Sequence, residues 1–231
     1  MDEDPLTFNQ IVQGIADFIE VAIHTILYIR RVYPAELFIR RKKYDTPVFQ
    51  SRHPALNEYI SGAVKAVADE LAAGNVEKVV VIIKDKDNVA LERYVFAVQN
   101  MIQVEAYNKD TSVLGAMTPT ALGQYFRAFM AKLSLMENQL GQLSLGDEGS
   151  FAVVIELRDD KAPSVSQGKD PPPWVPATTP HTTRGVADQA ELHMVRSVDT
   201  GIINISLAVQ ESEAKLNMQR EHIRKGKQRA V

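Results

Sequence analysis

The chain has 231 residues, a formal net charge of −3, 45% hydrophobic residues and no cysteine. This length corresponds to one large domain or two small ones, and folding should bury about 70% of the extended surface. The absence of cysteine excludes disulfides and cysteine-based zinc sites. A charge this near neutrality argues against a protein that coats nucleic acid with its whole surface, although local clusters of charge remain informative.

No stretch of the sequence predicts a membrane span. The most apolar stretch, Phe18 to Ile29, carries Glu20 and His24 and is shorter than the ~20 apolar residues that a span requires. The N-terminal residues Met1 to Asp4 are acidic, whereas a signal or transit peptide is basic there. We therefore expect neither export nor import into an organelle, and no membrane partner.

The longest helix is predicted over Phe8 to Ile29, where apolar residues recur at steps of three and four. Thr7 and Gln10 fit a capping box at its start. Arg30 and Arg31 follow its last turn and are expected to complement the helix dipole. Apolar residues extend beyond a single stripe, so this helix should pack on more than one side.

A short strand is predicted next, over Leu37 to Tyr44, and it contains the basic run Arg40 to Lys43. That run suits either a solvated strand edge, the more usual case, or a surface that faces a partner. His53 and Pro54 then begin a second helix, which ends at Gly74-Asn75.

A hairpin is predicted from Val76 to Val98. Val79 to Ile83 are five consecutive β-branched residues, which indicates a strand buried on both faces. The turn over Lys84 to Asn88 resembles the start of a calcium loop, but Ala90 stands where the glycine is needed. We therefore favour a polar turn that leads into a second strand, Ala90 to Val98.

Thr118 and Pro119 begin a third helix that ends near Gly141, and alternating apolar residues predict a strand over Phe151 to Leu157. Asp159 to Gly185 then contains six of the eleven prolines, which predicts a long loop.

The loop carries Trp174, the one tryptophan, whose ring must occupy a groove, anchor the loop or stay exposed. Strands over Val195 to Val198 and Ile202 to Val209 place the loop inside the fold rather than after it. Lys215 to Val231 has six basic residues and one acidic residue, which predicts a charged tail. Such a tail is most often disordered, and nucleic-acid contact or nuclear import is the alternative.

This order of elements favours an α+β fold with an antiparallel sheet, because strands follow one another without regular alternation with helices. The sequence has no glycine-rich phosphate loop, nucleophile elbow or zinc-protease motif, and its five histidines are scattered. His24 suits a buried, hydrogen-bonded histidine better than a general base. We therefore predict a protein that is not an enzyme and needs no cofactor or metal.

One block of sequence has a specific resemblance. Phe18 to Ile60 is FIEVAIHTILYIRRVYPAELFIRRKKYDTPVFQSRHPALNEYI. It closely resembles the HORMA-domain accessory subunit of DNA polymerase zeta, the Rev-seven or mitotic-arrest-deficient-two-like family. The similarity continues through Val76 to Val81, Glu92 to Phe96 and Arg127 to Ser134, and it is strong from about Phe8 to Leu157.

The resemblance implies a HORMA fold, in which three helices pack on an antiparallel sheet and a C-terminal segment acts as a mobile safety belt. It implies a HORMA domain over residues 1–212, with a core of about 8–157, a belt of about 158–210 and a basic tail over 213–231. In this family the belt wraps over a short partner peptide that pairs with the sheet edge.

Residue by residue, the resemblance implies that Tyr59 and Trp174 contact a peptide of the polymerase catalytic subunit. Arg127 matches an arginine used in HORMA dimers, but Arg31 stands where relatives can carry a glutamate, and a solvated arginine is the alternative.

The surface for the Rev-one translesion polymerase aligns with Leu192, Ser206 and Ala208. Ser206 and Ala208 replace larger side chains there.

The sequence therefore predicts an adaptor of translesion polymerases that acts in DNA-damage tolerance in the nucleus, with the cytoplasm as a further location. The partners implied are the polymerase zeta catalytic subunit, the Rev-one polymerase, a second HORMA domain and a remodelling AAA+ ATPase. Two alternatives stay open. One is a spindle-checkpoint HORMA protein that clamps mitotic regulators, and the other is a nucleic-acid-binding protein that acts through its basic tail.

Overall fold

The computed structural model describes residues 3–141, 143, 145, 149–159, 161–163, 175, 177 and 191–228, the last stretch with only the backbone of residues 222, 223 and 225–228. The helices are α1 (Phe8–Ile29), α2 (Pro54–Ala72), α3 (Pro119–Leu140) and α5 (Glu213–Gln228). The strands are β1 (Phe38–Lys43), β2 (Thr46–Ser51), β3 (Val76–Lys84), β4 (Ala90–Asn100), β5 (Ser150–Leu157), β6 (Glu191–Asp199) and β7 (Ile203–Glu211).

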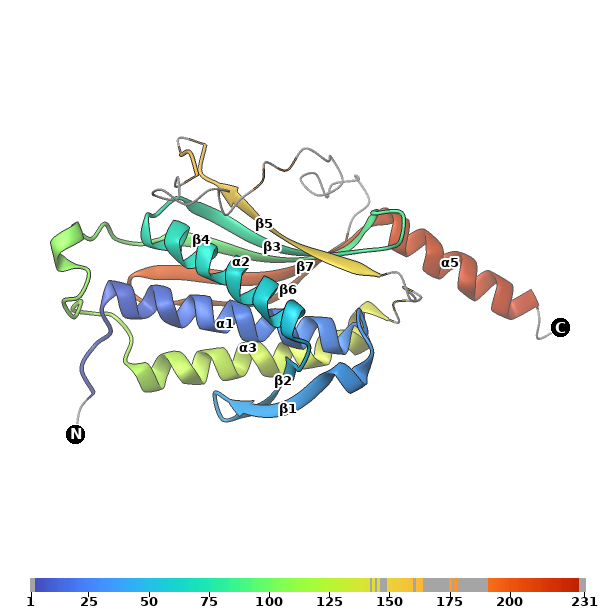
Figure 1. Ribbon diagram of the computed structural model, residues 1–231, viewed down its shortest axis with the longest axis horizontal. Helices are drawn as coiled ribbons and strands as arrows, with labels where there is room; N and C mark the ends of the chain where they lie inside the picture. Colours follow the sequence, from blue (N-terminus) through green and yellow to red (C-terminus); the bar gives the residue numbers. More distant parts are fainter. Residues whose placement is uncertain are drawn as a thin grey trace.

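Five strands form the main sheet in the order β5-β3-β4-β7-β6, and every neighbouring pair is antiparallel. Helices α1, α2 and α3 cover one face of this sheet (Figure 1). Val79, Val81 and Ile83 of β3 point into the core beneath the helices, and Val80 and Ile82 are buried on the other face. The predicted α+β fold, antiparallel sheet and doubly buried strand are confirmed.

Helix α1 is the centre of the core, as its apolar surface predicts. Ile11, Phe18 and Ile26 are fully buried, and the rings of Phe18 and Phe126 on α3 stack with centroids 4.5 Å apart. The capping box between Thr7 and Gln10 forms as expected. By length and composition α1 is apolar enough to cross a membrane, but 67% of its most apolar window is buried inside this domain.

His24 on α1 is buried and its Nδ1 accepts a hydrogen bond from the Ser51 backbone N–H at 3.4 Å. Burial lowers the pKa of His24 to about 4. The imidazole is therefore neutral at pH 7, and its contact with the β2 backbone fits the structural role expected from the sequence.

The second strand of the small β1–β2 hairpin was not predicted. Strand β2 pairs with β1 through a two-residue turn at Tyr44 and Asp45, both with φ of 53°. Positive φ at both positions is the geometry of the tight turns that join antiparallel strands, but the sequence lacks the usual Asn-Gly signal. Pro47 also argues against a strand, and it is tolerated here because β2 belongs to a two-stranded sheet.

Most of the predicted basic tail, from Glu213 to Gln228, is a helix and not a structureless segment. Helix α5 is a fourth helix beyond the three expected, and it projects from one end of the sheet toward the C-terminus (Figure 1). Its first turns are held by buried polar contacts, which the sequence pattern did not predict. Most of the proline-rich stretch Asp159–Gly185 lies outside the described residues.

Candidate functional site

Strand β5 has one unoccupied edge in the part of the chain that the structure describes. It pairs only with β3, from Val76 opposite Leu157 to Lys84 opposite Ser150. Such an edge presents main-chain N–H and C=O groups that an extended segment of another chain can bind. The free edge of β5 is therefore a candidate binding site.

Tyr59 of α2 lies at the start of this edge. Its ring meets Phe151 of β5 edge to face, with centroids 5.5 Å apart, and Tyr33 packs on Phe151 at 6.2 Å. Burial and then the neighbouring Tyr59 raise the pKa of Tyr33. Tyr59 remains 48% exposed, so much of its surface is available to a ligand.

A groove of about 420 Å³ lies along the other end of β5. One wall is the strand from Val153 to Leu157, and Pro163, Val175 and Ala177 also line the groove. Glu70, in the last turn of α2, is 1% exposed and is the one charged side chain among the described residues that line the groove. Helix α2 and strand β5 thus flank an apolar channel that suits an extended peptide.

Of the two residues expected to bind the peptide, the structure describes only one. Tyr59, a peptide contact by the family resemblance, lies beside β5 through its ring contact with Phe151, and its role in peptide binding stays a prediction. Trp174 lies outside the described residues. Phe151 and Glu70 were missed, although the alternation of β5 placed Phe151 on the same face as the buried Val153.

The second predicted surface lies on the outer face of the sheet, away from the helices. Leu192 pairs with Gln210, and Met194 pairs with Ala208, so alternation brings Leu192, Ser206 and Ala208 to that face. Leu192 and Met194 are each 61% exposed, whereas Ala208 is buried. The three predicted residues therefore share one surface of the β6–β7 hairpin.

Arg127 is exposed on α3 and lies near the β1–β2 turn. Lys42, by hydrogen bonding and charge, and then Arg127 lower the pKa of Asp45. Arg31 is also exposed and has a φ of 51°, so it ends α1 in a left-handed conformation.

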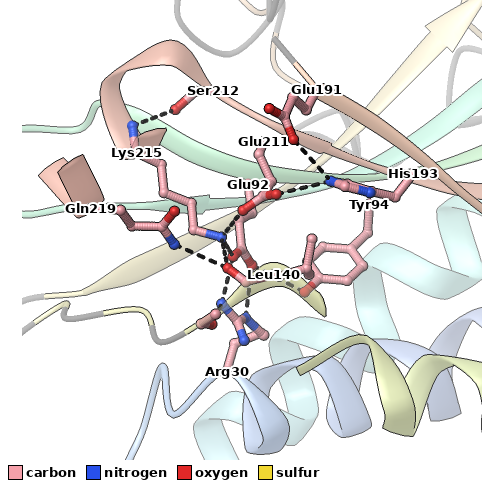
Figure 2. A network of polar contacts seen from close by, with 11 residues as sticks. Arg30, Glu92, Tyr94, Leu140, Glu191, His193, Glu211, Ser212, Lys215 and Gln219 are labelled. Atoms are coloured by element: carbon pink, nitrogen blue, oxygen red, sulfur yellow. Dashed lines mark hydrogen bonds and ion pairs between the residues drawn. The ribbon is translucent and has the colours of Figure 1, made fainter. Parts of the chain in front are cut away.

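A network of buried charges fixes the C-terminal elements to the core (Figure 2). Arg30 forms two hydrogen bonds with the Glu92 carboxylate, at 2.6 and 2.9 Å. Lys215 of α5 reaches the same carboxylate at 2.5 Å and donates to the Leu140 carbonyl at 2.8 Å. Arg30, expected to complement the dipole of α1, lies at the C-terminal end of that helix and is buried in an ion pair that the sequence did not predict.

Two further groups complete the network. Lys215 also pairs with Glu211 of β7, and Tyr94 donates to Glu92 at 3.1 Å. Burial and then the charge of Glu92 raise the pKa of Tyr94 well above its ordinary value, so its hydroxyl stays protonated. The network therefore joins α1, β4, β7 and α5, with the last carbonyl of α3 as a further acceptor.

Glu191, His193 and Glu211 bring three ligand atoms within 4.8 Å of one another, a set of groups that metals bind. His193 Nε2 lies 2.9 Å from Glu211. Because Lys215 already pairs with Glu211, a metal ion there would lie beside an ammonium group and be repelled. We assign no metal to this cluster.

Comparison with known proteins identifies the family that has this architecture. A HORMA domain model matches residues 12–202. The chain belongs to the HORMA-domain family. The resemblance found in the sequence and the fold that it implied are both confirmed.

Among the relatives of this HORMA protein, some are named as spindle checkpoint proteins and others as polymerase subunits. "Mitotic spindle assembly checkpoint protein MAD2B" of Rattus norvegicus is 31% identical over 220 residues, covering 91% of this chain and 95% of the relative. "DNA polymerase zeta processivity subunit" of Schizosaccharomyces pombe is 37% identical over 145 residues, covering 62% of this chain and 67% of the relative. The solved structure of Caenorhabditis elegans HTP-1 bound to the HIM-3 closure motif shares the fold, with a TM-score of 0.67, 11% identity and coverage of 88% and 91%.

Loss of the buried charge network should lower the free energy of unfolding of this HORMA domain. Replacing Lys215 with Met removes the buried ammonium from Glu211 and leaves Glu92 with Arg30 alone. Lys215→Met should therefore lower the free energy of unfolding by about 3 kcal/mol. The exposed Arg220 of the same helix provides the control, and Arg220→Met should change the free energy by less than about 0.5 kcal/mol. Urea denaturation followed by circular dichroism measures both, and equal midpoints for the two variants would contradict the role of the network.

Proposed function

We propose that this protein is a non-catalytic adaptor subunit of translesion DNA polymerase zeta. It binds an extended peptide of the catalytic subunit along the free edge of β5 and closes the belt segment, about residues 158–210, over it. The observation that carries the proposal is the outer edge of β5, which no described strand covers, next to an exposed tyrosine and an apolar groove. The name of the fission-yeast relative supports the choice of partner, and an adaptor that works on a nuclear polymerase acts in the nucleus.

The proposed mechanism uses main-chain pairing for affinity and side-chain contacts for selectivity. A peptide added to β5 gains backbone hydrogen bonds whatever its sequence. The contacts of the peptide with Tyr59 and with the groove then depend on which peptide side chains face α2. Because a belt closed over the peptide must open before the peptide leaves, dissociation is slow.

The remaining partners belong to the same proposal. The exposed Leu192 on the outer sheet face supports docking of the Rev-one polymerase away from the peptide edge. Arg127, exposed on α3, supports contact with a second HORMA domain. A remodelling AAA+ ATPase would supply the energy to open the belt. The rival assignment, a spindle-checkpoint protein that clamps mitotic regulators, is supported by the names of the vertebrate relatives and differs in the peptide that is bound.

Truncation of Tyr59 tests the peptide site. Tyr59→Ala should weaken binding of the catalytic-subunit peptide by about 2 kcal/mol, because an aromatic ring at a peptide edge is a typical hot spot. Tyr107→Ala is the control, since Tyr107 is 81% exposed and lies far from β5 in the sequence. Calorimetric titration should show a loss for the first variant only. Equal affinity of both variants and the parent would rule out the β5 edge, and preferential binding of checkpoint-regulator peptides would favour the rival assignment.

A second candidate function is contact with nucleic acid through α5. The observation that favours it is the projection of this helix from the body, with Arg220 and Arg224 exposed. The sequence between Arg220 and Arg229 has five basic residues and one acidic residue. Such a helix has the charge that phosphate backbones attract.

The salt dependence of the affinity for DNA tests this contact. The double variant Arg220→Gln/Arg224→Gln should reduce the slope of log affinity against log salt by about 2 for a fluorescent duplex DNA, since each lost phosphate contact contributes about 0.9. Arg40→Gln/Arg41→Gln removes the same charge from exposed positions of β1 and is the control. An equal reduction for both double variants would show a general charge effect and exclude α5 as a binding surface.

A further inference from the structure

Strand β1 lies at the periphery of the molecule with one edge away from β2. Within the described residues it pairs only with β2, which packs against α1, α2 and α3 (Figure 1). The two strands form a sheet of their own, separate from the five-stranded sheet that contains β5. The outer edge of β1 is therefore a second place where an extended segment can pair, distinct from the candidate site at β5.

The hydrogen bonds of the hairpin decide which main-chain groups of β1 point outward. At the start of the hairpin the Arg52 N–H donates to the Leu37 carbonyl at 2.7 Å. In antiparallel strands, residues that bond to the partner strand alternate with residues whose main-chain groups point away from it. Counted from Leu37, Arg41 bonds to β2 in the same way. The N–H and C=O groups of Arg40 and Lys42 therefore point to the outer edge.

This edge carries a run of positive charge. Arg40 to Lys43 are four consecutive cations, and all of them are exposed. The two nearest the turn lie close to carboxylates, because Lys42 pairs with Asp45 at 2.8 Å and Lys43 with Asp17 at 3.3 Å. The two arginines, farther from the turn, give the edge an excess of positive charge.

Charge and main-chain geometry together restrict what can pair with β1. Exposed cations on an edge strand disfavour pairing with another basic strand, because like charges across a strand pair repel. The same cations favour a strand that carries carboxylates, since opposite charges across the pair attract. Duplex DNA supplies negative charge but no peptide groups that could bond to the edge. An acidic polypeptide in extended conformation meets both requirements.

We propose that the outer edge of β1 binds an acidic, extended segment of a partner protein by strand addition. The main chain of the segment bonds to Arg40 and Lys42, and its aspartate or glutamate side chains lie across from the basic run. This surface goes beyond the peptide site proposed at β5. Because the two edges belong to different sheets, one molecule can hold both segments at once.

A defined acidic peptide tests strand addition on the full chain. The probe is a fluorescein-labelled decapeptide of alternating glutamate and threonine, and in the control peptide proline replaces every threonine. NMR-detected exchange should show that the probe protects the amides of Arg40 and Lys42, while the amide of Arg41, already bonded to β2, changes little. The probe should bind about fivefold or more tightly than the control peptide, because proline has no N–H to donate.

Charge reversal gives a second test by fluorescence anisotropy. At ~0.15 M salt, exposed charges more than about 8 Å apart are largely screened, so the measurement reports on nearby cations. Arg40→Glu should weaken binding of the probe about threefold or more, because an attraction across the strand pair becomes a repulsion. Lys86→Glu makes the same change of charge at an exposed position between β3 and β4, and its effect should be less than about twofold.

Several results would overturn the proposal. Equal losses for the two variants, or equal affinity of the two peptides, would show general attraction between charges and no strand addition. Failure of the probe to bind, or protection confined to the amides of β5, would exclude β1 as the site. Protection of Arg40 and Lys42 by duplex DNA would make nucleic acid the partner. If Arg40→Glu does not fold, the peptide comparison and the exchange data on the parent protein decide.

Discussion

Strands β5 and β6 follow one another in the sequence but lie at opposite edges of the five-stranded sheet. This topology decides which edge of the sheet is left open. With neighbouring strands about 4.8 Å apart, the connection must cross about 19 Å of sheet to bring the C-terminal hairpin to β4. Because the hairpin pairs with β4, no strand within the described residues covers the outer edge of β5, which is available for a peptide.

The buried charges hold that arrangement in place. Glu92 and Glu211 are balanced by Arg30 and Lys215, so the network is neutral although all four side chains are almost fully buried. A buried ion network adds less stability than an apolar core, but it is sensitive to geometry. If β7 shifted by one residue along β4, Glu211 would point to the other face of the sheet and lose Lys215. The network thus favours one register of the hairpin.

The sequence was sufficient for the elements whose apolar pattern is strong. Helix α1 and strand β3 were predicted closely, because α1 has a helical period with a capping box and β3 has a run of β-branched residues. The sheet order was not accessible from pattern alone, since it depends on pairing between distant segments. Strand β2 was missed because its turn has an uncommon sequence. Helix α5 was missed because its hydrogen bonds to the body of the protein come from the polar residues Lys215 and Gln219.

The candidate site was also predicted only in part, because it depends on packing between distant segments. Tyr59 was expected from the family resemblance. Phe151 and Glu70 belong to the site because α2 packs along β5, so that Phe151 contacts Tyr59 and Glu70 lines the groove. Glu70 belongs to the polar face of α2 by its type, and only the groove shows that it is buried. Lys215 had one signal in the sequence, its position one helical turn after Glu211, but nothing there pointed to Glu92 on β4.

Hydrogen exchange of the β5 amides tests whether a bound peptide pairs with this strand. With a peptide of the polymerase zeta catalytic subunit bound, the amides of residues 150–157 that point away from β3 should exchange more slowly, because they gain main-chain hydrogen bonds. Amides of β3, already paired on both sides, should change little. If the peptide binds while β5 exchange is unchanged, or if protection appears only in β6, the peptide does not occupy the free edge and the account is wrong.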